Sequence, residues 1–254
     1  MKIIIITQDD PFFLGDTLEF LLKNLPSGVE ITAAIVADVS PFGKKESFTR
    51  KAYKTFKIFG LAFFLRYSIK FIVNKFFKPN SVKRVLDKNN VKLINLNESI
   101  NSQESLKKIN NFNPDLLISI AGNEIFKRNL INLAPMGCLN LHTALLPKYR
   151  GLMPTFWVLR NREKETGVSV FFVDEGIDSG PILVQKRFKI NNMSQQQLIK
   201  FSKRIGMEAI IEAIKLIKDG DYNLIENNSN NASYFSFPTR SDVIKFKKNG
   251  AKFF

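Results

Sequence analysis

The chain has 254 residues, of which 44% are hydrophobic and 24% are charged, and it contains one cysteine, Cys138. This composition excludes disordered, collagen-like and disulfide-stapled classes, and it is typical of one large domain or one domain with an appendage. A lone cysteine cannot pair within the chain, so we expect a reducing compartment. The only apolar run near the start, Ile3 to Ile6, is too short for a signal peptide or a membrane span. We therefore expect a cytoplasmic protein.

Positive charge is concentrated in one segment. The chain has 38 Lys and Arg residues against 23 Asp and Glu, a net charge of +15. Between Lys44 and Lys88 there are 13 basic residues and only two acids, Glu46 and Asp87, so this segment carries +11 of the total. Such a balance favours anionic partners, although it does not bear on the fold.

Buried strands alternate with helices along the chain. Ile3 to Ile6 is a β-branched run typical of a strand buried on both faces, and a helix follows over 11–25. Further strands are predicted over 29–36, 91–94, 115–120, 138–141, 166–173 and 182–190, with helices ahead of residue 91, over 102–111 and over 193–218, the last ending at Gly220 as a left-handed C-cap. This order predicts an α/β fold, an open, mostly parallel, doubly wound Rossmann-like sheet with helices on both faces.

The basic segment interrupts this order as an amphipathic helical insertion at about 44–88. Its aromatic and basic residues fall at helical spacing, with a hinge predicted near Gly60. Arg66, Lys70 and Asn74 form one stripe at i, i+4 and i+8, opposite a broad apolar face. One interpretation is a helix pair packed on the sheet with its lysines in water, and the other is an interfacial pair that lies on an anionic bilayer. Nucleic acid is a third partner, less favoured because the Phe residues are spaced for a helix face and not for stacking bases.

Several common chemistries lack their motifs. The turn after the first strand reads T-Q-D-D-P over 7–11, without the glycines of a dinucleotide or nucleotide phosphate loop. The G-x-S-x-G elbow of α/β-hydrolases is also missing. With one histidine and one cysteine, the sequence predicts no metal site.

The polar residues that remain gather after two predicted strands. His142, the only histidine, follows Asn140 by two residues at the end of a strand, so both side chains point to the same side. Asp178 lies in a turn after a later strand that can reach the same crevice, at the sheet edge where such folds bind ligands. An amide, an imidazole and a carboxylate suit acyl transfer to an amine. Each residue also has an ordinary structural explanation in core packing, loop anchoring or turn formation.

Three motifs around these residues resemble those of the 10-formyltetrahydrofolate-dependent formyltransferases. They read N-L-H over 140–142, L-L-P-K-Y-R-G over 145–151 and D-E-G-I-D-S-G-P-I-L over 174–183, and their order is highly specific. The resemblance implies a formyltransferase catalytic domain over 1–220 and a short aromatic and basic C-terminal extension over 221–254. It also implies that Asn140 and His142 bind the formyl oxygen, and that Asp178 pairs with His142 and helps to accept the amine proton.

The resemblance further implies how the formyl donor, 10-formyltetrahydrofolate, is bound. Backbone groups of two loops hold its pterin in this family. In this chain the loops correspond to Glu124, Ile125 and Phe126, and to Asp174, Glu175, Gly176 and Ile177.

The amine acceptor is left open by the resemblance. Glycinamide ribonucleotide enzymes carry a Gly-rich phosphate loop where this chain has Q-D-D-P over 8–11, and methionyl-tRNA formyltransferases usually add a large C-terminal domain. The segment G-L-M-P-T-F-W over 151–157 and the aromatic tail look most like formyltransferases of amino sugars in surface-polysaccharide pathways. We therefore expect a nucleotide-linked or lipid-linked amino sugar, and the basic 44–88 segment favours the lipid-linked form at an anionic membrane.

Other functions fit the same residues. The net charge of +15 suits tRNA as acceptor. Water in place of the amine would give a deformylase that releases formate. A non-enzymatic membrane or nucleic-acid binding protein on this fold is disfavoured by the complete set of Asn140, His142 and Asp178. The expected location is the cytoplasm, peripheral on the inner face of the membrane in the lipid-linked case, and the oligomeric state is left open.

Overall fold

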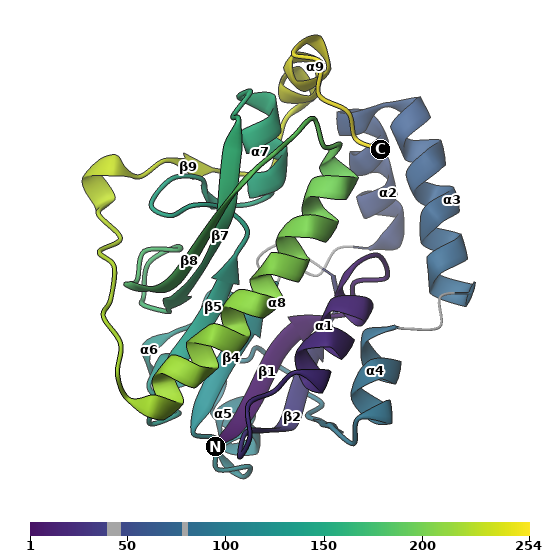
Figure 1. Ribbon diagram of the computed structural model, residues 1–254. Helices are drawn as coiled ribbons and strands as arrows, with labels where there is room; N and C mark the ends of the chain where they lie inside the picture. The colour runs from purple at the N-terminus through teal and green to yellow at the C-terminus, as the bar shows by residue number, and fades with distance from the viewer. Residues whose placement is uncertain (40–46, 78–80) are drawn as a thin grey trace.

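A seven-stranded sheet forms the centre of the protein (Figure 1). The computed structural model describes residues 1–39, 47–77 and 81–254, so Lys44, Lys45 and Lys78 of the predicted insertion lie outside the described residues. The strand order is β3-β2-β1-β4-β5-β7-β8. These strands are β1 (Lys2–Gln8), β2 (Glu30–Ala37), β3 (Lys92–Leu93), β4 (Leu116–Ile120), β5 (Cys138–His142), β7 (Glu165–Phe172) and β8 (Ile182–Lys189).

The sheet is parallel from β3 to β5 and antiparallel at β7 and β8. This confirms the predicted open, mostly parallel, Rossmann-like α/β fold. Strand β3 is shorter than the predicted 91–94, and it has a single neighbour because it lies at the edge of the sheet.

Alternate residues of β1 enter two separate cores. Ile3 and Ile5 face α1 (Leu14–Lys23), α4 (Val82–Lys88) and α8 (Gln195–Asp219). Ile4 and Ile6 face the opposite core, which contains residues of α5 (Gln103–Asn110) and α6 (Arg128–Ile131). Because both faces of the sheet are covered, a continuous apolar run is stable in this strand and no alternation with polar residues is needed. The prediction of helices on both faces is confirmed.

Helix α8 begins and ends at the predicted signals. The Ser194 hydroxyl accepts a hydrogen bond from the Gln197 N–H while the Gln197 side chain accepts one from the Ser194 N–H, which forms a capping box. Gly220 has φ of +71° and closes the helix in the left-handed region, as predicted. The helix crosses one face of the sheet beside α1 (Figure 1).

A third, aromatic core joins the last residues of the chain to the body. Phe246 of α9 (Arg240–Lys248) stacks on Phe156 of α7 (Pro154–Arg160) with ring centroids 4.9 Å apart, and on Phe253 at 4.4 Å. Ahead of these, the 3-10 helix Ser229–Asn231 leads to β9 (Tyr234–Phe235), which pairs in parallel with β6 (Arg150–Gly151). Residues 221–254 therefore pack closely on the rest of the chain, and a domain boundary at 220 stays a prediction.

Within the basic segment, α4 packs in the core with Ile3 and Ile5, while α2 (Phe48–Phe59) and α3 (Leu61–Phe77) lie beside the C-terminus (Figure 1). Gly60 separates them with φ of +87°, which confirms the predicted hinge. Among the described residues, none of the helices combines the length and the hydropathy that a membrane crossing requires.

The basic stripe of α3 includes Arg66 and Lys70, and one interpretation of the sequence placed its lysine face in water. The Arg66 guanidinium lies 4.5 Å from the ring centroid of Phe254, and the Lys70 ammonium lies 4.6 Å from the same centroid. Lys70 also donates a hydrogen bond to the Gln196 side chain at 2.5 Å. These cation–π contacts turn the stripe toward the end of the chain, so the expectation is wrong for Lys70.

Candidate active site

A cavity of about 540 Å³ opens at the carboxyl ends of β1, β4 and β5. From β1 the chain builds β2 and β3 on one side of that strand, and after β3 it crosses over to place β4 on the other side. Such a switch point is where open α/β sheets bind ligands. Nine of the ten residues that the sequence predicts for the site line this cavity: Asn140, His142, Asp178, Glu124, Ile125, Phe126, Asp174, Gly176 and Ile177.

His142 is the last residue of β5 and is 6% exposed. Its Nε2 lies 2.7 Å from the carbonyl oxygen of Tyr149. Because a carbonyl oxygen only accepts hydrogen bonds, this contact assigns a hydrogen to Nε2. The other ring nitrogen, Nδ1, lies 3.5 Å from Oδ2 of Asp178. The Asp178 carboxylate therefore faces the Nδ1 edge of the ring, while the Tyr149 carbonyl holds the Nε2 edge.

Asp178 is held by backbone as well as side-chain contacts. Its Oδ2 accepts a hydrogen bond from the Gly151 N–H at 2.8 Å, and its carbonyl oxygen accepts one from the Asn227 side chain at 2.9 Å. Its φ is +50°, a left-handed conformation that Asp tolerates better than most residues. These contacts fix the carboxylate before any ligand binds.

Asn140 shares the strand face of His142 because the two residues are two positions apart in β5. Its side-chain amide makes no hydrogen bond to another described residue, although the residue is partly buried and lines the cavity. A partly buried amide without a protein partner is available to a ligand.

The two loops predicted to hold the donor form two walls of the cavity. In the first, the Glu124 carboxylate accepts a hydrogen bond from Ser99 at 2.5 Å, and the Ile125 carbonyl accepts one from Asn101 at 2.9 Å. In the second, Asp174 Oδ1 accepts hydrogen bonds from the Gly176 N–H at 3.1 Å and from the Ser179 hydroxyl at 2.7 Å. The first loop is thus held by the neighbouring segment 99–101, and the second by hydrogen bonds within the loop itself.

Glu175 is the one predicted residue that does not line the cavity. Its carboxylate accepts a hydrogen bond from Arg128 at 2.6 Å, and both side chains are exposed. The pairing raises the pKa of Arg128 through the hydrogen bond and the charge of Glu175. The side chain of Glu175 therefore lies on the solvent-exposed surface of the loop and not in the cavity.

Several residues with a left-handed backbone conformation lie around the cavity. Ala121, Met153 and Asp178 all line it, with φ of +61°, +54° and +50°. Such backbone costs about 1 kcal/mol or more per residue and persists where the surroundings enforce it, a feature that is common at active sites.

Two charged residues of the cavity are not anticipated by the sequence. Lys203 of α8 lies 4.0 Å from the Asp10 carboxylate in the loop after β1, and each side chain is 14% exposed. Burial lowers the pKa of Lys203, and the charge of Asp10 opposes this effect. No hydrogen bond joins the Lys203 ammonium to another described residue. The sequence did contain a signal that Lys203 faces inward. Lys203 follows Ile199 by four positions and precedes buried Met207 by four, so it lies on the apolar stripe of the helix.

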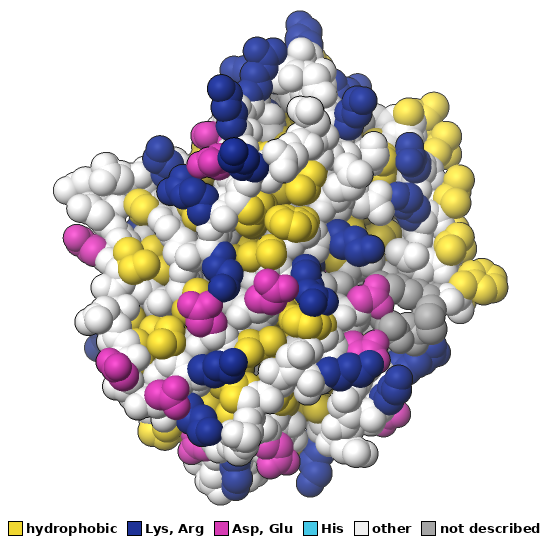
Figure 2. Space-filling model, viewed as in Figure 1, with side chains coloured by type: hydrophobic (Ala, Val, Ile, Leu, Met, Phe, Trp, Pro, Cys, Tyr) yellow, Lys and Arg dark blue, Asp and Glu magenta, His cyan; other side chains and the backbone are white. Residues whose placement is uncertain are grey.

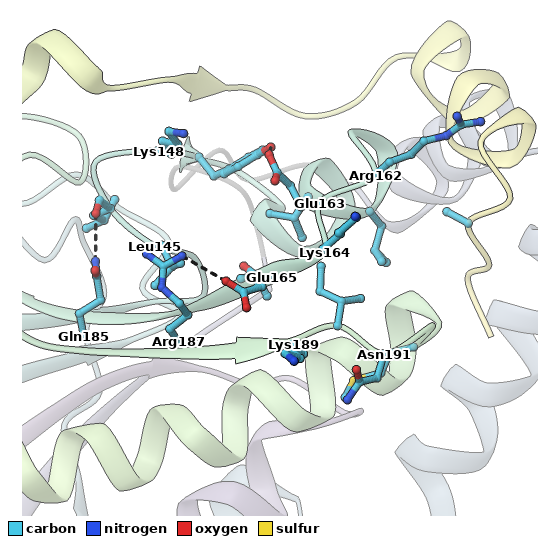
Figure 3. A pocket seen from close by; sticks show the side chains of 18 of the residues that line it. Leu145, Lys148, Arg162, Glu163, Lys164, Glu165, Gln185, Arg187, Lys189 and Asn191 are labelled. Atoms are coloured by element: carbon cyan, nitrogen blue, oxygen red, sulfur yellow. Dashed lines mark hydrogen bonds and ion pairs between the residues drawn. The ribbon is translucent and has the colours of Figure 1, made fainter.

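A larger hollow of about 1710 Å³ is lined by Leu145 and Lys148 of the loop after β5 and by residues of β7 and β8 (Figure 3). Its charged lining residues are mostly basic, with Lys148, Arg162, Lys164, Arg187, Lys189 and Lys252 against Glu163, Glu165 and Glu226. Some are paired, since Arg187 lies 3.5 Å from Glu165. None of the ten predicted site residues lines this hollow, so it does not contain the predicted chemistry.

Metal ligands are not grouped in the part of the chain that the structure describes. No set of three His, Cys, Asp or Glu side chains there is placed to hold an ion. The Cys138 thiol is buried in β5, and burial raises its pKa to about 12.

Comparison with known proteins identifies the family to which the chain is related. A family model described as formyl transferase matches residues 71–214. A methionyl-tRNA formyltransferase from Kosmotoga olearia is 36% identical over 159 residues, which cover 62% of this chain and 51% of that protein. The chain spans about half the length of the curated relatives that it matches.

Solved structures share the fold at lower identity. An N-formyltransferase from Helicobacter canadensis, in complex with folinic acid and dTDP-3-aminofucose, has a TM-score of 0.58 at 21% identity, covering 95% of this chain and 72% of that one. A phosphoribosylglycinamide formyltransferase from Bacillus halodurans has a TM-score of 0.61 at 17% identity, covering 87% and 97%. The match over more than half of the chain confirms the resemblance of the motifs, and the protein belongs to the formyl transferase family.

Proposed function

We propose that the protein transfers a formyl group from 10-formyltetrahydrofolate to a primary amine, and that the amine belongs to an amino sugar linked to a nucleotide or a lipid. The convergence of Asn140, His142 and Asp178 on one cavity carries this proposal. These three groups supply two hydrogen-bond donors and a carboxylate, which acyl transfer to nitrogen requires.

The cavity suits the donor in size and in lining. A volume of about 540 Å³ lies within the range of roughly 300 to 1,000 Å³ that is usual for small-molecule sites. Its lining is mainly apolar, with Ile125, Phe126 and Ile177 available to the flat faces of a pterin. Backbone groups of 124–126 and 174–177 would hold the ring edge.

In the reaction that we propose, the amine nitrogen attacks the formyl carbon, and a new C–N bond forms. Asn140 and His142 stabilise the oxygen as it becomes negative. Asp178 accepts the proton that the attacking nitrogen loses, directly or through a water. The bond from the carbon to N10 of the donor then breaks, and the proton passes to N10, so tetrahydrofolate and a formamide are released.

Two observations support an amino sugar with an anionic carrier. The structure from Helicobacter canadensis contains an amino sugar nucleotide, dTDP-3-aminofucose. The Lys203 ammonium lines the same cavity as His142, and within the described ranges its one ion pair is the distant contact with Asp10 at 4.0 Å. A phosphate of the acceptor would satisfy its three N–H donors.

The second candidate acceptor is methionyl-tRNA. The curated relatives are methionyl-tRNA formyltransferases, and the basic hollow of Figure 3 could receive a phosphate backbone. In either case the chemistry at Asn140, His142 and Asp178 is the same, so the acceptor is a separate question from the reaction.

An acceptor panel tests the proposal. The protein is incubated with 10-formyltetrahydrofolate and, in separate reactions, with nucleotide-linked amino sugars, lipid-linked amino sugars, methionyl-tRNA or no acceptor. We expect the mass of one formyl group to be gained by an amino sugar. Formylation of methionyl-tRNA alone would replace the sugar assignment. Rapid formate release without any acceptor would indicate a deformylase, and no consumption of the donor in any reaction would refute formyl transfer.

A further inference from the structure

An outward-facing stripe of large apolar side chains runs along α3. Leu61, Leu65 and Ile69 are 60%, 52% and 63% exposed, and the stripe continues to Phe76 at 72%. Figure 2 shows a column of hydrophobic side chains along the edge of the molecule that α3 forms, next to Lys and Arg side chains. Helices α2 and α3 carry further exposed apolar residues, which are Phe48, Tyr53, Phe56, Ile72, Val73 and Phe77.

The opposite face of α3 already supplies the packing that holds the helix on the protein. Tyr67 contacts Phe12 with ring centroids 4.9 Å apart, and Phe63 stacks on Phe254 at 5.4 Å. The helix is therefore apolar on two sides and only one of them is covered. A helix that is apolar all round is stable when both sides are buried, and an exposed apolar stripe of this length marks an interaction surface.

Charge identifies the partner. Neither α2 nor α3 contains Asp or Glu, while seven Lys or Arg residues lie on them. A second copy docked through the same face would bring two cationic helix pairs together, which is unfavourable. An anionic lipid surface complements both features, because it accepts apolar side chains below its headgroups and attracts cations at them.

We propose that α2 and α3 dock the protein on an anionic lipid bilayer, with the stripe from Leu61 to Phe76 inserted at the boundary of headgroups and acyl chains. The 17 residues of α3 give a length of about 25 Å in the plane of the surface. Lys57 is exposed on α2, where it would meet lipid phosphates. Arg66 and Lys70 contribute less directly, because their cations lie over the ring of Phe254. The inference goes beyond formyl transfer and does not depend on it.

Vesicle flotation tests the docking surface. The full chain is mixed with vesicles of phosphatidylcholine alone or with phosphatidylglycerol added, and the fraction that floats is measured at low and high salt. We expect binding to the anionic vesicles, weakened by salt, and little binding to phosphatidylcholine alone. The triple variant Leu65→Gln, Ile69→Gln and Phe76→Gln should lose about tenfold or more in partition coefficient, because three inserted apolar side chains become polar.

A matched variant controls for surface hydrophobicity in general. Leu93→Gln, Met136→Gln and Leu224→Gln also replace exposed apolar side chains, on elements outside α2 and α3. This control should float like the parent, and circular dichroism should show that both triple variants are folded. A soluble acceptor should be formylated equally by the α3 variant and the parent, and a chain inactive in formyl transfer should still float.

Three results would overturn the docking proposal. The parent could fail to bind anionic vesicles, or the α3 variant could bind them as the parent does. Light scattering could also show a dimer that the α3 variant converts to a monomer, without vesicle binding by the parent, in which case the stripe is a self-association surface.

Discussion

The imidazole of His142 and the carboxylate of Asp178 meet across the cavity, with Nδ1 3.5 Å from Oδ2. They come from different parts of the sheet, since His142 ends β5 and Asp178 lies in the turn between β7 and β8. The same Oδ2 accepts the Gly151 N–H at 2.8 Å, and Nε2 of His142 is held by the Tyr149 carbonyl. Both groups are thus oriented by the backbone of one short segment, 149–151, before substrate binds.

Replacing Asp178 with Asn should remove the charge while an amide oxygen still accepts the Gly151 N–H. We expect kcat to fall roughly 10²- to 10⁴-fold, because an amide cannot accept the proton that the attacking amine loses. Steady-state kinetics checks this, and Asp219→Asn on the exposed end of α8 serves as the control. An Asp178→Asn variant with parental kcat would contradict the role of the carboxylate.

Asn140→Ala should lower kcat about 10²- to 10³-fold with a small change in donor KM, as expected for loss of one donor to a developing oxyanion. The amide has no hydrogen-bond partner among the residues that the structure describes, so stability should change little. Thermal unfolding and steady-state kinetics on the same preparation measure both effects. If only KM rose, Asn140 would bind substrate without favouring the transition state.

Lys203→Met should raise the KM of a phosphate-bearing acceptor by about tenfold or more and leave the donor KM unchanged, because one charge-assisted hydrogen bond is lost. Burial lowers the pKa of Lys203, and the ammonium is charged only below that pKa. The parent should therefore lose acceptor affinity as pH rises through the lowered pKa, whereas the Met variant should not. An unphosphorylated amino sugar is the control, and equal effects on both acceptors would exclude a phosphate contact.

Asp242→Asn tests the ion pair between Asp242 of α9 and Arg160 of α7. Burial raises the pKa of Asp242, but hydrogen bonds from Thr239 and the Arg160 guanidinium at 3.0 Å outweigh burial, and the net pKa is lowered. The pKa of this carboxyl in the unfolded chain is near 3.8. Because its pKa is lower in the folded protein, the ionised carboxylate adds stability at pH values above 3.8, and this stability is lost as pH falls through the folded pKa. The variant should be less stable by about 0.5 to 1 kcal/mol at neutral pH.

Denaturant unfolding of the Asp242→Asn variant at neutral pH and near pH 3 measures this difference, which should shrink at the lower pH. Asp221→Asn, at an exposed position, is the control. A difference that is equal at both pH values would show that the effect is not electrostatic.

The sheet and its main helices were predictable because their residues carry local periodic signals. Ile3 to Ile6 and the capped helix α8 are examples, and both match the structure. Helices α7 and α9 were missed, since their stability comes from the contact of Phe156 with Phe246, far apart in the sequence. The orientation of Arg66 and Lys70 was also beyond local pattern, because it depends on Phe254 at the end of the chain.

In the candidate site, too, the residues could be predicted from the sequence, whereas the contacts that orient them could not. Asn140, His142 and Asp178 stand in motifs, and the strand period places the first two on one face. The contacts that orient them come from the backbone of Tyr149 and Gly151, which leaves no trace in residue type. Glu175 was included with its loop, yet its side chain turns to Arg128, because residues next to one another in a turn face different directions.

The central claim is that the cavity around His142 transfers a formyl group, and His142→Ala tests it most directly. The measurement is formation of formylated amine together with tetrahydrofolate, by parent and variant, with circular dichroism to show that both are folded. The parent should release the two products in equal amounts, and the variant should retain about 1% of that rate or less. Parental rates in a folded His142→Ala variant, or donor breakdown without any formylated amine in the parent, would contradict the account.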